Sequence, residues 1–396
     1  MRREVVVIEG HIVDSGIMSD ILDTIIQSKA QFSILSFEMG KTNEDHSKAK
    51  IEVSGLADDV TALLPRLNAL GCFLDSPRTA AIKTVEEDRV LPDDFYSTTN
   101  HVTKIFHDNE WITVKNQRMD AVIVVSEDGA VCRKLREVRK ADKVVCGVEG
   151  IRVWPEFQSR DRSNFAFMSN EISSERRVEL AVKKVAEIIS PSDVRTAIVA
   201  GPVVVHTGAS QSLCRIMEKG YIDLLLSGNA LAVHDIEQSF YGTSLGIHLG
   251  NGLPVNDGHR NHMRAINTIY RAGSIAEATK QGILTSGIMY TCIKKNIPFV
   301  LAGSIRDDGP LPEVITDMNA AQEAYAEALK DIDVVLMLST MLHSIAVGNM
   351  LPSRTRTIIA DINPSVVTKL SDRGSSQAVG IVTDVGLFLK MLSETL

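Results

Sequence analysis

Short apolar runs alternate with amphipathic segments through the C-terminal half of the chain. Six runs of strand length are separated by stretches in which apolar positions have helical spacing, and these runs span residues 196–205, 222–226, 299–302, 334–338, 357–362 and 379–384. Strands that alternate with helices predict a mostly parallel sheet covered by helices on both faces. We therefore expect an α/β protein whose Rossmann-like domain covers residues 173–396.

The N-terminal segment has a different pattern. Apolar strands and helices follow one another in the order strand, helix, strand, strand, helix, strand, at residues 5–12, 16–28, 32–37, 49–54, 57–70 and 79–84. This βαββαβ order predicts a ferredoxin-like α+β domain over residues 1–90.

Residues 91–172 are rich in short β-type runs separated by polar turns. These runs lie at residues 102–106, 111–114, 121–125 and 143–146. They predict a small β-rich domain. The amphipathic stretch 173–189 then predicts a helix that leads into the parallel-sheet domain.

Composition narrows the class of partner. The chain has 396 residues, 44% of them hydrophobic, and a net charge of −8 without a long basic block. This balance argues against nucleic acid or an anionic membrane as the main partner. The apolar runs are too short to span a membrane, and Glu9 interrupts the first of them, so we expect neither a membrane anchor nor a signal peptide.

Cysteine usage predicts the compartment. Five cysteines are present, an odd number, and none forms a CxxC pair. Their spacing argues against both structural zinc and a disulfide framework. We expect buried thiols in a reducing cytoplasm and no bound metal.

Polar residues follow several of the predicted strands. The glycine-rich dinucleotide fingerprint GxGxxG is absent, and the turn 207–210 is a weak substitute that an ordinary strand-to-helix turn explains as well. The carboxyl ends of parallel strands meet at one edge of a sheet, where ligands bind. The polar groups expected to converge there are Asn229, Asp308, the loop from Ser339 to His343, Asp361 and Asp384. Asp361 ends a strand at a position where a carboxylate commonly holds a nucleotide ribose, so the pattern predicts a dinucleotide user.

The chain resembles a known family in its most polar stretches. SGNALAVHD, GNGLPVNDGHRNH, STMLHSIAVGN and ADINP are similar to the archaeal NAD-dependent ornithine cyclodeaminases, which carry a region conserved in LOR/SDH bifunctional enzymes. The similarity covers the whole chain and extends to the C-terminal part of cyanobacterial arginine dihydrolase/ornithine cyclodeaminases. It implies a domain like those of deoxyhypusine synthase and sirtuins. It also implies NAD contacts at Asn229, Ala230, Asp308, Thr340, Met341, Leu342, His343, Asp361, Asp384 and Val385.

The implied reaction converts L-ornithine to L-proline and ammonia through transient hydride transfer to NAD. It requires acid–base groups at the two amines and a cation for the carboxylate. Asp257 and His259, in the polar loop 244–264, are the acid–base candidates, with Arg260 or Arg264 on the carboxylate. Asp235 is the reserve candidate.

Two other functions stay open. One is an NAD-linked amino-acid dehydrogenase of the saccharopine or lysine type, which would accumulate NADH. The other is a nucleotide-sensing regulatory protein, because a ferredoxin-like domain resembles small effector-binding modules. The substrate could be ornithine, lysine or a related diamino acid, because one methylene changes binding by only about 1–3 kcal/mol. We expect a homo-oligomer.

Overall fold

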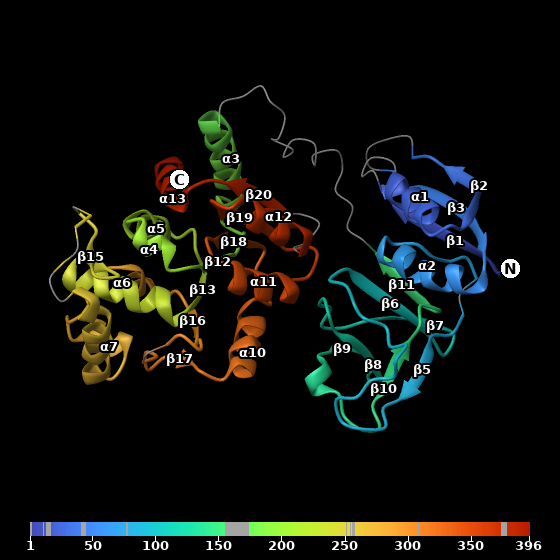
Figure 1. Cartoon of the computed structure of the whole chain (residues 1–396), viewed down its shortest axis with the longest axis horizontal. Helices are drawn as coiled ribbons and strands as arrows, with labels where there is room; N and C mark the ends of the chain where they lie inside the picture. Colours follow the sequence, from blue (N-terminus) through green and yellow to red (C-terminus); the bar gives the residue numbers. More distant parts are fainter. Residues whose placement is uncertain are drawn as a thin grey trace. The chain divides into compact units, whose positions relative to one another are not determined.

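The computed structural model describes residues 2–10, 12, 17–40, 45–76, 78–154, 174–250, 252–253, 255, 258–307, 309–373 and 378–396 (Figure 1). Contacts divide the chain into two compact units, residues 1–166 with 352–354 and residues 167–351 with 355–396. The first unit holds antiparallel sheets and the second holds a parallel sheet.

The first sheet of the N-terminal unit has the predicted βαββαβ order, although its last strand is not the predicted one. Its elements are β1 (Arg2–Gly10), α1 (Ile17–Gln27), β2 (Gln31–Glu38), β3 (Ser47–Gly55), α2 (Ala57–Ala69) and β4 (Phe73–Leu74). The strands pair antiparallel in the order β2-β3-β1-β4. Alternate residues of β3, among them Ile51 and Val53, are buried against the apolar faces of α1 and α2. This is the ferredoxin-like arrangement.

The strand predicted at residues 79–84 belongs to a different sheet. β5 (Ala81–Thr84) pairs with β10 (Lys143–Cys146), and the fourth strand of the first sheet is instead β4. The assignment of residues 79–84 to the first sheet was wrong because a two-residue strand such as β4 has no alternating pattern to recognise, while the next apolar run has one. The proposed domain boundary at residue 90 stays a prediction.

The β-rich region forms two small sheets. A four-stranded sheet has the order β5-β10-β8-β9, and a three-stranded sheet has the order β11-β6-β7. The remaining strands are β6 (Val102–His107), β7 (Glu110–Thr113), β8 (Val122–Ser126), β9 (Gly129–Arg133) and β11 (Ile151–Trp154). The four strands expected between residues 102 and 146 are therefore confirmed, and β9 and β11 add to them.

The second unit is built on a seven-stranded parallel sheet with the order β17-β16-β13-β12-β18-β19-β20. Its strands are β12 (Thr196–Ala200), β13 (Leu224–Gly228), β16 (Phe299–Ala302), β17 (Val314–Ile315), β18 (Val334–Leu338), β19 (Arg356–Asp361) and β20 (Ala378–Val382). All six predicted strands are present, and β17 was not predicted. The α/β class and the parallel sheet are confirmed.

One of those strands was predicted too long. The apolar run 196–205 leaves the sheet at Gly201, and its last valines form the short helix α4 (Val203–His206). Pro202 cannot donate a ladder hydrogen bond, which explains why the strand ends there although β-branched residues continue. Val204 and Val205 are fully buried in the helix instead.

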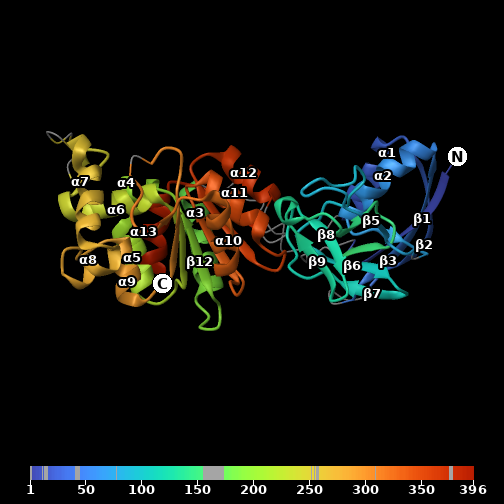
Figure 2. The same cartoon turned by 90° about the horizontal axis from the view of Figure 1, so that it is seen from below.

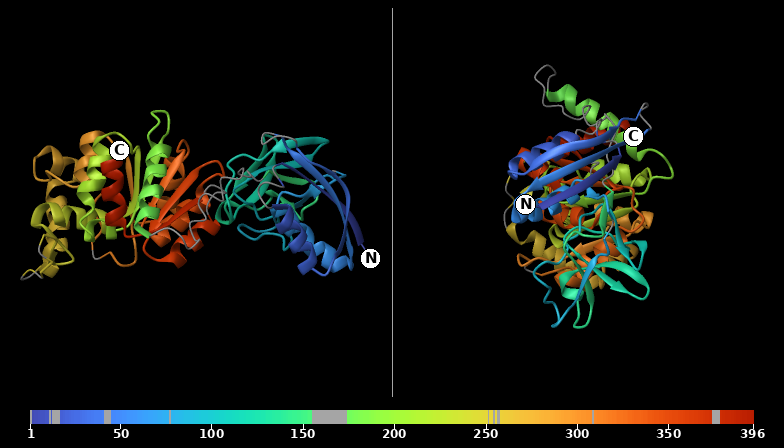
Figure 3. Two further views of the ribbon diagram at one scale, coloured as in Figure 1. Left: turned by 90° about the horizontal axis from the view of Figure 1, so that it is seen from above. Right: turned by 90° about the vertical axis from the view of Figure 1, so that its right-hand side faces the viewer.

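Helices cover both faces of this sheet (Figures 2 and 3). Ile198 packs into a core shared with one set of helices, whereas its neighbours Ala197 and Val199 pack into a second core on the opposite face. The first set is α3 (Ser174–Ile189), α5 (Ser210–Glu218), α6 (Asn229–Tyr241), α9 (Ile288–Lys295) and α13 (Val385–Thr395). The second set is α10 (Met318–Ala328), α11 (Met341–Met350) and α12 (Pro364–Arg373). Burial on both faces explains why the strands are continuously apolar.

A buried carboxylate on α6 holds the start of α9. The two oxygens of Asp235, which is fully buried, accept the backbone N–H groups of Ile288 and Met289, each at 2.8 Å. Burial raises the pKa of Asp235 to about 6, and these two hydrogen bonds oppose the rise. The carboxylate satisfies two donors of a helix terminus that have no partner within the helix.

Asp235 makes stability depend on pH. Between the ordinary pKa of 3.8 and the folded value of about 6, the unfolded chain loses this proton before the folded chain does. Its contribution is therefore complete below the first value and lost as pH rises through the second, at about 1.4 kcal/mol per pKa unit. We expect wild type to gain stability relative to Asp235→Asn as pH falls from 7 to 5, measured by urea unfolding. A stability difference that does not change with pH would contradict this.

Candidate functional site

A cleft lies where the strand order of the parallel sheet reverses. The chain runs from β12 outward to β17 on one side, then returns to β18 and runs to β20 on the other. A cavity of about 400 Å³ opens at the carboxyl ends of the central strands. It is lined from β12 and β13 by Ala200, Gly201 and Gly228, and from beyond β18 by Thr340 and His343. Ligands of open α/β sheets bind at such switch points.

Two glycines keep the walls of this cleft close together. A Cβ on Gly201 would overlap the carbonyl oxygen of Ser339, and a Cβ on Gly228 would lie 3.1 Å from His343 Nε2. Larger residues would therefore push the two sides apart or fill the space between them. These glycines allow the backbone to approach a ligand closely, although they do not form the GxGxxG fingerprint.

Two helices that begin at the cleft have no side-chain cap. α6 starts after Gly228 and α11 starts after Thr340, and neither residue accepts a hydrogen bond from its helix with a side chain. By contrast, Asp317 and Asp384 cap α10 and α13 in this way. At the first N–H groups of α6 and α11, no N-cap side chain therefore competes with an anionic ligand, and the helix dipoles favour a phosphate there.

His343 is held in one orientation by Tyr325. The Tyr325 hydroxyl donates to the Ser227 carbonyl oxygen at 2.6 Å and lies 3.0 Å from His343 Nδ1. Because the hydroxyl proton is used on Ser227, Nδ1 must be the donor in the second bond. Burial lowers the pKa of His343, so the ring is neutral and presents Nε2 as an acceptor beside Gly228. A ribose hydroxyl is the type of donor that this nitrogen would accept.

Several of the residues predicted to contact the dinucleotide meet at this cleft. Asn229, Ala230, Thr340 and His343 line it, and Asn229 Oδ1 also accepts the N–H of Leu311 at 3.0 Å. That bond fixes the loop after β16 against the start of α6. The loop also brings Arg306 and Asp307 to the cleft, while the predicted Asp308 lies outside the described residues.

The other predicted contacts lie at neighbouring strand ends. Met341 and Leu342 are exposed in the first turn of α11. Asp361 ends β19, is half-buried and accepts the Asn363 N–H through one oxygen at 2.8 Å. Asp384 caps α13 through Leu387 N–H at 2.9 Å, and Val385 is buried behind it. A carboxylate with one hydrogen bond still has capacity to accept others.

The polar loop 244–264 reaches the cleft, but its three predicted catalytic residues lie only partly within the part of the chain that the structure describes. Leu245 and His262, near its two ends, line the cavity. Asp257 lies outside the described residues. His259 is in a short 3₁₀ turn (Gly258–Arg260) and its side chain is not described, whereas Arg260 is exposed before α7 (Asn261–Ala272).

Sequence reasoning missed a histidine on α6 that lines the same cavity. His234 Nδ1 lies 2.9 Å from an oxygen of Glu237, whose side chain is fully buried. Ala230, His234 and Glu237 are spaced by four and three residues, so they share one face of the helix. That spacing was a usable signal, because it places two ionisable side chains on the face that begins at the cleft.

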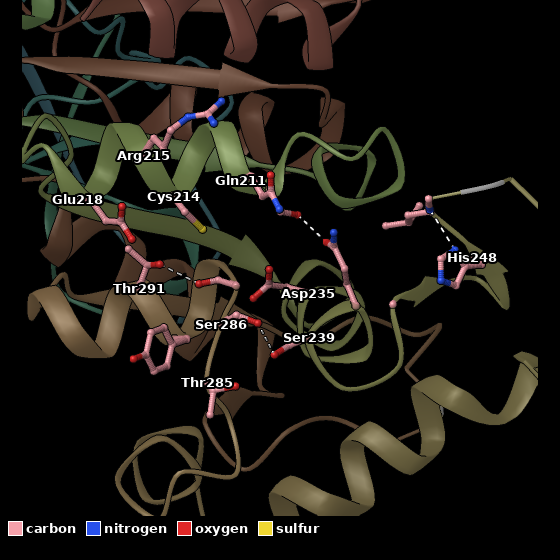
Figure 4. A pocket seen from close by; sticks show the side chains of 17 residues that line it. Gln211, Cys214, Arg215, Glu218, Asp235, Ser239, His248, Thr285, Ser286 and Thr291 are labelled. Atoms are coloured by element: carbon pink, nitrogen blue, oxygen red, sulfur yellow. Dashed lines mark hydrogen bonds between the residues drawn. The ribbon is translucent and has the colours of Figure 1, made fainter.

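A larger cavity lies elsewhere, between α5, α6 and α9 (Figure 4). It measures about 600 Å³, and the reserve candidate Asp235 lies in its wall. Both oxygens of Asp235 hold the start of α9, and the residue does not line the cleft at the strand ends. The smaller cavity is the better ligand site because helix N-termini and strand ends converge on it.

Two classes of feature are absent from the described part of the chain. No three His, Cys, Asp or Glu side chains among those residues are arranged to hold a metal ion. No described helix is both long and apolar enough to cross a membrane.

Family models match the chain from end to end. Residues 3–101 match the LOR/SDH bifunctional enzyme conserved region, residues 102–182 the first C-terminal region of ArgZ-like arginine dihydrolases, and residues 179–392 their C-terminal Rossmann fold. A protein of Methanothermobacter thermautotrophicus named ornithine cyclodeaminase is 49% identical over 99% of this chain and 97% of its own length.

Solved structures agree with these matches. Apo ArgZ, an arginine dihydrolase of the cyanobacterial ornithine-ammonia cycle, superposes with a TM-score of 0.85 at 41% identity. A ternary complex of AgrE with ornithine and NAD⁺ superposes with a TM-score of 0.54 at 44% identity. Both alignments cover all of this chain and 58% of the other.

Proposed function

The chain belongs to the ornithine cyclodeaminase family, and we propose that it converts L-ornithine to L-proline and ammonia with NAD as its cofactor. The observation that carries this proposal is the cleft at the switch point of the parallel sheet, with two uncapped helices beginning at it. Relatives named for this activity share about half of their residues with the chain over nearly its full length, 49% in the M. thermautotrophicus protein.

The residues at the cleft fit a dinucleotide. The N–H groups at the starts of α6 and α11, which no N-cap side chain binds, would receive the pyrophosphate, beside Asn229 and Ala230 on one wall and Thr340 to His343 on the other. Asp361, at the end of β19, would accept the ribose hydroxyls. Asp308, Asp384 and Val385 complete the set that we propose.

The reaction determines what the protein's own residues must do. NAD, when bound, supplies a reversible hydride acceptor, so ornithine can lose ammonia without net oxidation. The protein must hold the ornithine carboxylate, orient the side-chain amine toward carbon 2 and exchange protons with both nitrogens. We propose Arg260 for the carboxylate, and Asp257 and His259 among the groups that the polar loop brings to the substrate.

One assay tests this function against the two alternatives. Purified protein with L-ornithine and a catalytic amount of NAD⁺ should form proline and ammonia in equal amounts, measured by chromatography, without NADH accumulation at 340 nm. Net NADH formation would favour an amino-acid dehydrogenase. NAD⁺ binding without turnover of ornithine or lysine would favour a sensor.

We further propose a homo-oligomer that pairs through β2. All eight residues of β2 are exposed, its pairing among the described strands is with β3 alone, and Glu38 is its one charged residue. Phe32, Ile34 and Leu35 are 37%, 45% and 53% exposed. A long uncharged edge strand tends to pair with another strand. A second copy running antiparallel would place Phe32 opposite Phe37 and neutral Gln31 opposite Glu38, without like charges in contact.

The edge-strand proposal predicts that Leu35→Lys lowers the molar mass of the protein in solution, because a charge on an edge strand opposes pairing. Light scattering after size exclusion would measure this. Leu56→Lys, at another exposed leucine of the first unit, is the matched control. An unchanged mass in Leu35→Lys would refute pairing through β2.

We propose the cytoplasm as the compartment. All five cysteines are free, and four of them are buried. Burial raises the pKa of the Cys72 thiol to about 12, which keeps it protonated. Small molecules, without nucleic acid or membrane, are the partners that we propose beyond the second copy.

A further inference from the structure

A chain of buried hydrogen bonds runs from α7 to His234 beneath the cleft. Asn261 Nδ2 donates to Thr243 Oγ1 at 3.0 Å, and Thr243 Oγ1 donates to Glu237 Oε1 at 2.8 Å. The other oxygen of Glu237 lies 2.9 Å from His234 Nδ1. Glu237, Thr243 and Asn261 are all buried, so the network is fixed by the fold.

Glu237 is a carboxylate that this network keeps ionised. Burial is the largest single influence and acts to raise its pKa, but the interactions with His234, Thr243 and Gly246 together exceed it, and the net shift is downward. The N–H of Gly246 adds a further hydrogen bond at 3.4 Å. An ionised carboxylate only accepts hydrogen bonds, so His234 Nδ1 must carry a proton. In the neutral ring, Nε2 is then the free base.

The position of His234 gives its side chain access to a ligand in the cleft. The residue lines the cleft, and its side chain is 12% exposed, so one part of the ring is reached from the cavity while the rest is enclosed. It lies on the second turn of α6, the helix whose first N–H groups face the cleft. The substrate of a cofactor bound at those groups would lie close to this helix face.

The charged and titratable groups around His234 support this role. On α4, the His206 ring packs edge-on against the His234 ring, with 4.9 Å between the two ring centroids. Burial, and after it the proximity of His234, lowers the pKa of His206 to about 4, although Glu237 acts in the opposite direction. His206 is therefore neutral, and its Nδ1 is 2.7 Å from Ser244 Oγ. The other ionisable groups lining the cleft are His262 on α7, Arg306 and Asp307 after β16, and His343 on α11.

We propose that His234 is a catalytic residue that carries a proton between the two substrate nitrogens, and that Glu237 positions it. This inference rests on the proposed function. The side-chain nitrogen, which reaches the site as the neutral amine after losing its ammonium proton to solvent, uses its lone pair to form the new bond to carbon 2 and becomes a secondary ammonium. His234 Nε2 takes the proton from this nitrogen and gives it to the nitrogen leaving carbon 2, which departs as ammonia. One proton is taken and one is returned, so the ring ends in its starting state.

Glu237 stabilises His234 while the ring holds the transferred proton. When His234 holds the extra proton, its imidazolium forms an ion pair with a carboxylate that is already in place and needs no rearrangement. A hydrogen bond from Thr243 fixes the position of that carboxylate, and Asn261 in turn holds Thr243. The arrangement resembles the carboxylate–histidine pairs of other acid–base enzymes in geometry and role.

His234→Gln tests the proposal because the amide keeps the size of the ring but cannot carry a proton. We expect kcat to fall by about 100-fold or more, as is typical of a lost general acid–base group. The Kd for NAD⁺, measured by fluorescence quenching, should stay within about threefold of wild type, because no cofactor contact is removed. His248→Gln is the matched control, since His248 lines the larger cavity between α5, α6 and α9. It should retain wild-type kcat.

Glu237→Gln gives a second, independent readout. Removing the negative charge takes away the ion partner of the His234 imidazolium, so the acidic limb of the kcat–pH profile should move to lower pH while kcat falls. A merely structural role for Glu237 would lower the amount of active protein without moving that limb.

Three outcomes would overturn the inference. A His234→Gln variant with kcat within about threefold of wild type would show that another group moves the proton. Equal losses of kcat and NAD⁺ affinity in that variant would show a structural role. An acidic limb that does not move in Glu237→Gln would remove the positioning role. Failure of wild type itself to form proline would instead overturn the proposed function, so the two failures are distinguishable.

Discussion

Gly228→Val is expected to abolish NAD binding without unfolding the protein. Gly228 has φ −93° and ψ 168°, a backbone conformation open to any residue, so the substitution introduces no backbone strain. The new side chain would fill the cleft beside His343 Nε2, which lies 3.1 Å from the position of a Cβ. We expect Gly228→Ala to weaken the NAD⁺ affinity by about tenfold, equivalent to about 1.4 kcal/mol, and Gly228→Val by more than about 100-fold.

A control separates this effect from a general cost of replacing glycine. Gly55, at the end of β3, would place a Cβ no closer than 3.5 Å to its neighbours, which is ordinary contact. Gly55→Ala should therefore keep wild-type NAD⁺ affinity in titration calorimetry. Tight NAD⁺ binding by Gly228→Val would show that the cofactor lies elsewhere.

Asp361→Ser is expected to produce the second large effect, on the choice of cofactor. A carboxylate at this strand end accepts ribose hydroxyls and repels a 2′-phosphate. Loss of hydrogen bonds to a charged group costs about 1.5–3 kcal/mol, so the NAD⁺ affinity should fall by about 10- to 100-fold. NADP⁺ affinity should fall less or increase, because the repulsion is removed. Parallel binding titrations with the two cofactors would measure both changes.

The matched control for Asp361 lies at the opposite edge of the same sheet. Asp333 precedes β18 and accepts the N–H of Arg195 at 3.0 Å, remote from the strand ends that form the cleft. Asp333→Ser removes the same charge and should leave the ratio of NAD⁺ to NADP⁺ affinity unchanged. An equal change of that ratio in both variants would attribute the effect to net charge alone.

The sequence predicted the parallel sheet well because its strands are buried on both faces. Val334–Leu338 is apolar at every position and ends at Ser339, so both its strand and its carboxyl end were readable. The run 196–205 was not read correctly, since β-branched residues continue through the turn at Pro202 into α4. β-propensity does not distinguish a strand from a short buried helix that follows it.

The site could be predicted only in part, for a physical reason. Strand ends indicate which loops converge, and Asn229, Thr340 and His343, which were predicted in this way, line the cleft. The pairing of His234 with Glu237 depends on which face of α6 turns toward the cleft and on the buried Thr243 behind it. The spacing of His234 and Glu237 indicates that they share one face of the helix, but it does not indicate which way that face turns. The polar loop was predicted from its composition. The hydrogen-bond network from Asn261 to His234 depends on tertiary contacts, which composition does not indicate.

Hydride taken from carbon 2 of ornithine by NAD bound in this cleft would be returned to the same carbon. L-Ornithine deuterated at carbon 2 reveals this return when the proline product is analysed by mass spectrometry. We expect proline that keeps one deuterium at carbon 2, formed without net NADH. Proline without deuterium, or deuterium that accumulates in free cofactor, would contradict it.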